Sequence, residues 1–123
     1  MKIYFAAPFT LGPFVRRLHE RAREIGHAPT SRWCGESDGK PDKLSTMSLA
    51  DRARHLAEND ADIAEADILV AIVVRGLGKE MFAEATLARL LDKPIYWVGD
   101  EDDMPLSAFR VGSAVLPGTE PLL

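Results

Sequence analysis

Two glutamates, Glu80 and Glu84, have the type and the spacing to bring carboxylate chemistry to one place. They lie four residues apart in residues 79–91, a segment whose pattern predicts a helix, so they are neighbours on its surface. At about 100° per residue, the apolar side chains of this segment fill an arc of roughly 160°, with Glu84 near its centre and Glu80 just inside its edge. The arc consists of Met81, Ala85, Leu87, Ala88 and Leu91.

A carboxylate on the core-facing side of a helix costs free energy unless it is paired or used. One interpretation is that Glu84 pairs with a cation from elsewhere in the fold, since buried ion pairs do occur. The other is that Glu84 belongs to a functional site. The pattern of the helix leaves both interpretations open.

The segments on either side of this helix place it in a βαβ unit. Residues 66–74 form a continuous apolar run rich in β-branched side chains, which predicts a strand covered on both faces, as in a parallel sheet. Gly76 and Gly78 predict a tight turn with free backbone N–H groups, and residues 94–98 predict a second strand. The turn would then lie outside the carboxyl end of a strand, where parallel sheets bind ligands.

The rest of the chain continues the alternation of strands and helices. Further strands are expected at 2–7 and 27–33, further helices at 14–25 and 48–65, and a short final strand within 106–116. Residues 34–47 form a long loop, typical of a lid, a binding loop or disorder. The alternation predicts one α/β domain over residues 1–123, with a doubly wound, mainly parallel sheet of four or five strands and helices on both faces, as in flavodoxin-like or Rossmann-like folds.

Composition narrows the classes of function. A net charge of −4 gives no reason to expect a nucleic-acid polymer as partner. The single cysteine, Cys34, excludes an internal disulfide and fits a reducing cytoplasm. No apolar run approaches the length of a membrane span. The three histidines form no ligand-spaced cluster with Cys34, so we expect neither a metal site nor a cofactor.

Several motifs, in their order and spacing, resemble one known family. Residues 2–9 read Lys-Ile-Tyr-Phe-Ala-Ala-Pro-Phe, and Ala66-Asp67 precedes the apolar strand. Gly76-Leu77-Gly78, then Glu84, then Lys93-Pro94-Ile95 follow. From Lys2 to Gly99 the chain thus resembles the nucleoside 2-deoxyribosyltransferase-like family, which includes deoxynucleoside monophosphate N-glycosidases.

The resemblance implies cleavage or transfer at the N-glycosidic bond of 2-deoxynucleosides or deoxynucleotides. A glutamate attacks the anomeric carbon and forms a covalent glycosyl-enzyme, and an acid protonates the leaving base. When residues are counted back from Lys93-Pro94, the family's nucleophile falls on Glu84. When they are counted forward from the glycine turn, it falls on Glu80. We prefer Glu84, because the spacing between a helix and the next strand varies less than the length of a turn. The proton donor or orienting group is expected at Asp62 or Asp60.

The substrate is expected between the loop after the first strand and the glycine turn. The expected substrate-binding residues are Tyr4, Ala7, Pro8, Phe9, Trp33, Gly76, Gly78, Lys79 and Glu80, whereas Trp97 is expected in the core. If the substrate is a monophosphate, the glycine turn and Lys79 could hold its phosphate.

The chain departs from the family pattern at three positions. Ala7 and Thr86 replace glycines, and Asn59 stands where the family has an aspartate. These departures keep open an alternative function, a non-catalytic nucleotide-binding or sensing module on the same scaffold.

The resemblance also implies a homodimer or a larger homo-oligomer, because neighbouring subunits complete each site in that family. We therefore expect light scattering at micromolar concentration to give a mass above that of one chain. A monomeric mass under these conditions would contradict this expectation.

Overall fold

The fold is built around a parallel sheet whose strands lie in the order β2-β1-β3-β4-β5. The computed structural model describes residues 1–35, 47–110 and 112–116. Within them, the strands are β1 (Lys2–Ala6), β2 (Ala28–Pro29), β3 (Ile68–Ile72), β4 (Ile95–Val98) and β5 (Ser113–Leu116). All neighbouring strands are parallel, which confirms the predicted α/β class and the upper estimate of five strands.

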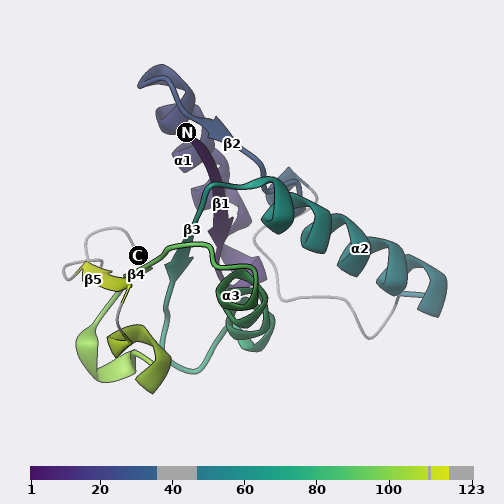
Figure 1. The fold of residues 1–123 in the computed structure, drawn as a ribbon. Helices are drawn as coiled ribbons and strands as arrows, with labels where there is room; N and C mark the ends of the chain where they lie inside the picture. Colours follow the sequence, from purple (N-terminus) through teal and green to yellow (C-terminus); the bar gives the residue numbers. More distant parts are fainter. Residues whose placement is uncertain (36–46, 111, 117–123) are drawn as a thin grey trace.

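The connections contain α1 (Gly12–Glu24), α2 (Leu49–Glu65) and α3 (Lys79–Leu90), as Figure 1 shows. Single-turn 3₁₀ helices η1 (Phe9–Leu11), η2 (Trp33–Gly35), η4 (Glu101–Asp103) and η5 (Leu106–Phe109) complete the described elements. Ser48 caps α2 by accepting a hydrogen bond from the backbone N–H of Asp51 at 3.1 Å. No helix in the described ranges has the length and apolarity to cross a membrane.

The predicted second strand is shorter than expected. Residues 27–33 were expected to be extended, yet only Ala28 and Pro29 pair with β1. One further bond joins the Thr30 backbone N–H to the Ile3 carbonyl at 2.8 Å, and the chain then turns into η2. The predicted loop at 34–47 lies mostly outside the described residues.

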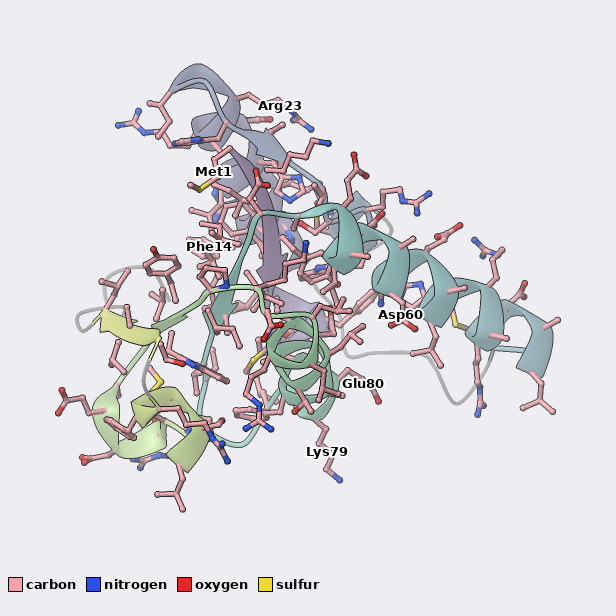
Figure 2. All side chains as sticks on the ribbon, in the orientation of Figure 1. Met1, Phe14, Arg23, Asp60, Lys79 and Glu80 are labelled. Atoms are coloured by element: carbon pink, nitrogen blue, oxygen red, sulfur yellow. The ribbon has the colours of Figure 1, made fainter. Side chains whose placement is uncertain are left out.

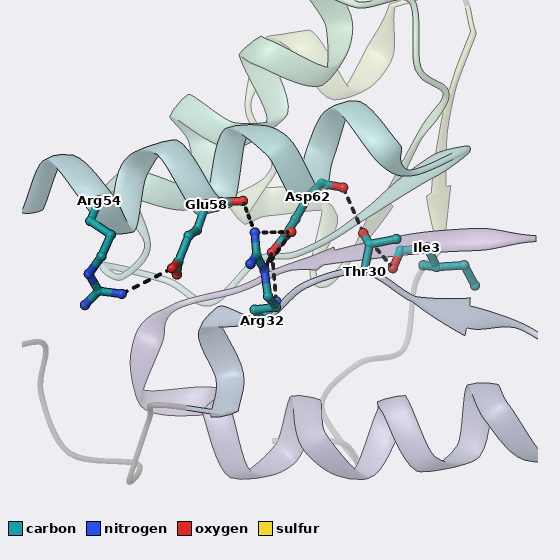
Figure 3. A network of polar contacts seen from close by, with 6 residues as sticks. All are labelled: Ile3, Thr30, Arg32, Arg54, Glu58 and Asp62. Atoms are coloured by element: carbon teal, nitrogen blue, oxygen red, sulfur yellow. Dashed lines mark hydrogen bonds and ion pairs between the residues drawn. The ribbon is translucent and has the colours of Figure 1, made fainter. Parts of the chain in front are cut away.

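Helices cover both faces of the sheet, as predicted. Successive side chains of a strand point to opposite faces. On β1, the ring of Phe5 packs against His19 of α1 with centroids 5.5 Å apart, whereas its neighbour Tyr4 contacts Glu84 of α3. Figure 3 shows the same arrangement, with α2 above β1 and α1 below it.

The central pair of strands brings two loops to one edge. In the register of β1 and β3, Ile3 lies opposite Ile68 and Ala6 opposite Ala71, so both strands end together. The loops that follow are in contact, because a Cβ atom added at Gly78 would lie 3.4 Å from the Pro8 side chain. This confirms the predicted adjacency of the first loop and the glycine turn.

Trp97 lies in the core as expected, with 1% of its surface exposed, and its ring stacks on Phe82 of α3. The core therefore fixes α3 against β4 as well as against β1.

Gly99, which follows β4, has a backbone conformation and surroundings that favour glycine. Its φ is +154°, and an added Cβ would lie 2.9 Å from the Val73 carbonyl oxygen. Gly26 has a φ of +91° but nothing within 4 Å of an added Cβ. We expect Gly99→Ala to lower the free energy of unfolding by about 3 kcal/mol and Gly26→Ala by about 1 kcal/mol, because only the first adds overlap to strain. Urea unfolding of both variants measures this; equal losses would contradict it.

Candidate active site

A cleft of about 660 Å³ opens between the loop after β1, the helix α2 and the start of α3. It lies at the edge where the carboxyl ends of β1 and β3 meet. Such an edge is where open parallel sheets bind ligands. The lining residues are Ala7, Pro8, Phe9, Thr10, Trp33, Arg52, His55, Leu56, Asn59, Asp60, Leu77, Gly78, Lys79, Glu80, Met81, Ala83 and Glu84.

Most of the residues predicted to bind substrate line this cleft. Ala7, Pro8 and Phe9 come from the first loop, Trp33 from η2, and Gly78, Lys79 and Glu80 from the start of α3. Two predicted residues are absent from the lining. Gly76 is exposed in the turn before α3, and Tyr4 lies beneath the cleft.

Glu84 is held from below by Tyr4. The Tyr4 side chain is 0% exposed, and its hydroxyl donates a hydrogen bond to Oε2 of Glu84. Glu84 forms no ion pair with a cation among the residues that the structure describes. The interpretation that Glu84 pairs with a cation from elsewhere in the fold is therefore wrong for these residues. Tyr4 was expected to bind substrate, but its place in β1 buries it beneath the cleft, where its hydroxyl binds the carboxylate of Glu84.

Burial changes the acidity of this pair. It raises the pKa of Glu84 to about 7, while the hydrogen bond from Tyr4 lowers it and the charges of Glu80 and Asp60 raise it further. Burial and the nearby Glu84 also raise the pKa of Tyr4 well above its ordinary value. Tyr4 therefore remains a donor, and Glu84 changes its charge close to neutral pH.

Two further carboxylates face the cleft near Glu84. Figure 2 shows Asp60 on α2 and Glu80 on α3 on the sides that the two helices turn toward each other. Both residues are exposed, in contrast to the more enclosed Glu84. The described residues contain no cluster of three or more His, Cys, Asp or Glu side chains able to hold a metal ion.

Asp62 lies elsewhere, bound to Arg32 (Figure 3). Its carboxylate accepts from the Arg32 backbone N–H at 3.1 Å and from Nε at 2.9 Å, and Nη2 lies 2.9 Å away. Asp62 lines a different hollow, of about 410 Å³, beside Lys2 and Glu65. The structure thus places Asp60 at the cleft with Glu84, and ties Asp62 to the segment after β2.

The aromatic side chains form an apolar wall. The rings of Phe9 and Trp33 have centroids 6.1 Å apart, and Trp33 is fixed by the hydrogen bond from its Nε1 to the Phe5 carbonyl at 2.8 Å. The same cleft is also lined by the polar side chains of Arg52, Asn59, Asp60, Glu80 and Glu84. Such a lining suits a ligand with a flat apolar part and a polar part.

Apart from Asp60, sequence reasoning missed the residues that α2 contributes to the cleft. Arg52, His55, Leu56 and Asn59 line it together with Asp60. Their spacing of three and four residues is that of one helix face, so the signal was present in the sequence. It was obscured because charged, polar and apolar side chains are mixed on this face.

No protein-family model and no curated protein matches the sequence, but solved structures match the fold. The 2-deoxyribosyltransferase of Bacillus psychrosaccharolyticus matches with a TM-score of 0.72 and 19% identity, over 99% of this chain and 90% of that one. The CMP N-glycosidase BcmB of Clostridium botulinum matches with a TM-score of 0.62 and 13% identity, over 96% and 88%. The chain therefore has the fold of nucleoside 2-deoxyribosyltransferase-like proteins, as the sequence motifs predicted.

We expect Tyr4→Phe to raise the pKa of Glu84 above about 7, because it removes a donor that stabilises the carboxylate and changes the shape of the core little. The pKa can be followed by NMR titration of the glutamate side-chain carboxyl carbons. Tyr96→Phe, on the exposed side of β4, is the matched control and should leave the titration of Glu84 unchanged. A pKa that falls or stays constant in Tyr4→Phe would show that the hydrogen bond does not tune Glu84.

Proposed function

We propose that this chain is an enzyme that cleaves or transfers at the N-glycosidic bond of 2-deoxynucleosides or deoxynucleotides, with Glu84 as the nucleophile. The observation that carries the proposal is the placement of Glu84 in the cleft with one carboxylate oxygen bound by a buried tyrosine. The fold shared with a 2-deoxyribosyltransferase and an N-glycosidase supports it.

The reaction begins with attack of Glu84 on the anomeric carbon of the sugar. Because Tyr4 binds Oε2, the other oxygen, Oε1, is the one that attacks. A C–O ester bond forms, the C–N bond to the base breaks, and its electron pair leaves with the base nitrogen. The enclosed setting of Glu84 strengthens its interaction with the positive charge that develops on the sugar.

The leaving base needs a proton, and Asp60 is the better placed of the two aspartates to supply it. Asp60 lines the cleft with Glu84, whereas Asp62 is occupied by Arg32. In the second step, water or another base attacks the sugar and releases Glu84. If water attacks, the enzyme is a hydrolase, and if a second base attacks, it is a transferase; the proposal includes both. The proposal also includes a homodimeric state and a cytoplasmic location.

One observation favours the alternative, a non-catalytic nucleotide-binding module. Asn59, which stands where the resembling family has an aspartate, lines the cleft itself. An amide at this position can bind a base but cannot serve as an acid. The alternative predicts nucleotide binding without release of free base, which chromatography after incubation with deoxynucleosides and their monophosphates would detect.

We expect Glu84→Gln to keep the fold and ligand binding, because the amide has nearly the same shape. It should lower the rate of glycosidic cleavage at least about a hundredfold, the scale of removing one catalytic group. Glu80→Gln, one helical turn away and exposed, is the matched control and should lower the cleavage rate far less.

The cleavage rate of the unaltered enzyme should rise with pH through about 7 as Glu84 ionises.

The rates of free-base release, followed by chromatography, decide between the two glutamates. If Glu80→Gln is the slower variant, the nucleophile is Glu80. If neither variant changes a measurable rate of cleavage, the mechanism is wrong.

A further inference from the structure

The cleft contains an arginine that the proposed reaction does not use. Arg52 lies in the first turn of α2 and lines the cleft that also holds Glu84. Its Nε atom is buried and has no hydrogen-bond partner among the residues that the structure describes. A buried donor left unpaired destabilises the fold, more so when it is charged, so such a group calls for an explanation. An anion bound in the cleft would supply the missing acceptor.

Positive and negative side chains of the cleft lie at different positions along α2. Arg52 and Asp60 lie on the same helix face, eight residues apart, which corresponds to about 12 Å along the helix axis. The carboxylates of Asp60, Glu80 and Glu84 are grouped, since the first two act on the pKa of the third. The cleft therefore has an anionic end, where the glycosidic bond would be cleaved, and a cationic position farther toward the start of α2.

Arg52 suits a phosphate better than Lys79 does. Lys79 precedes Glu80 directly, so a phosphate bound there would meet the repulsion of the grouped carboxylates. Figure 2 also shows the Lys79 side chain extending outward from the start of α3, away from α2. Arginine offers a planar set of donors that matches two phosphate oxygens at once, which the point charge of lysine does not.

Building on the function proposed above, we propose that the substrate is a nucleoside 5′-monophosphate and that Arg52 binds its phosphate. The 5′ position is the sugar substituent farthest from the anomeric carbon, so a phosphate there can lie toward Arg52 while the anomeric carbon faces Glu84. The apolar wall of Phe9 and Trp33 is then left for the base. Each part of such a nucleotide meets a matching group of the cleft.

The test compares the binding of two ligands that differ only in the phosphate. Isothermal titration calorimetry on Glu84→Gln, which should block turnover, measures the affinity for the four common 2′-deoxynucleoside 5′-monophosphates and for the matching nucleosides. When Arg52→Ala is combined with Glu84→Gln, binding of the preferred monophosphate should weaken at least about tenfold. This is the loss expected when a hydrogen bond to a charged group is removed. Nucleoside binding should change by less than about threefold. Arg52→Lys should restore part of the loss.

Arg54→Ala is the matched control. Arg54 is exposed on the same helix and pairs with Glu58, as Figure 3 shows. The Nη1 and Oε1 atoms of the pair are 3.2 Å apart, and removing Arg54 should leave both affinities within about twofold. Circular dichroism should show an unchanged fold in every variant.

Three results would overturn the assignment of Arg52. They are equal affinity for monophosphate and nucleoside before Arg52 is changed, equal losses for both ligands in Arg52→Ala, and a phosphate-selective loss in Lys79→Ala instead. These binding results do not depend on cleavage. The proposed function fails separately, if Glu84→Gln leaves the rate of base release unchanged.

Discussion

The candidate site depends on one hydrogen bond, from the buried Tyr4 hydroxyl to the carboxylate of Glu84. Desolvation alone would favour the protonated form of this carboxyl group. The tyrosine offsets part of that effect by stabilising the charged form, so that the pKa lies at about 7 and not higher. It also fixes which oxygen is free. Without such a donor, a half-buried glutamate would destabilise the fold and gain no stabilisation of its charged form.

This hydrogen bond depends on how other parts of the fold are arranged. Tyr4 reaches Glu84 only because β1 and β3 are neighbours and α3, which follows β3, packs over the face of β1 that carries Tyr4. The same pairing joins the loop of Pro8 to Gly78 and so closes the floor of the cleft. The helix α2 then adds a wall, and the bonds between Asp62 and Arg32 hold that wall to the segment after β2. Asp62 therefore shapes the cleft indirectly.

The sequence predicted the sheet, the order of helices and the position of Glu84 because these follow from periodicity and from apolar runs. It could not separate Asp60 from Asp62, because the side that each turns to depends on how α2 crosses the sheet. Tyr4 was predicted to bind substrate, whereas the structure buries it against Glu84. Strand alternation predicts that Tyr4 shares a face with Ala6, but it does not predict which element covers that face. The length of β2 was overestimated because pairing at an edge strand is decided by where the chain turns away.

The partners in this hydrogen bond are 80 residues apart in sequence. Contacts of such long range form only after the loop between them has been closed, which makes folding slow relative to chains with local contacts. During synthesis, β1 leaves the ribosome long before α3 exists, and its tyrosine has no carboxylate to orient. The shifted pKa of Glu84 therefore depends on the packed central sheet, because both its burial and its tyrosine partner come from that packing.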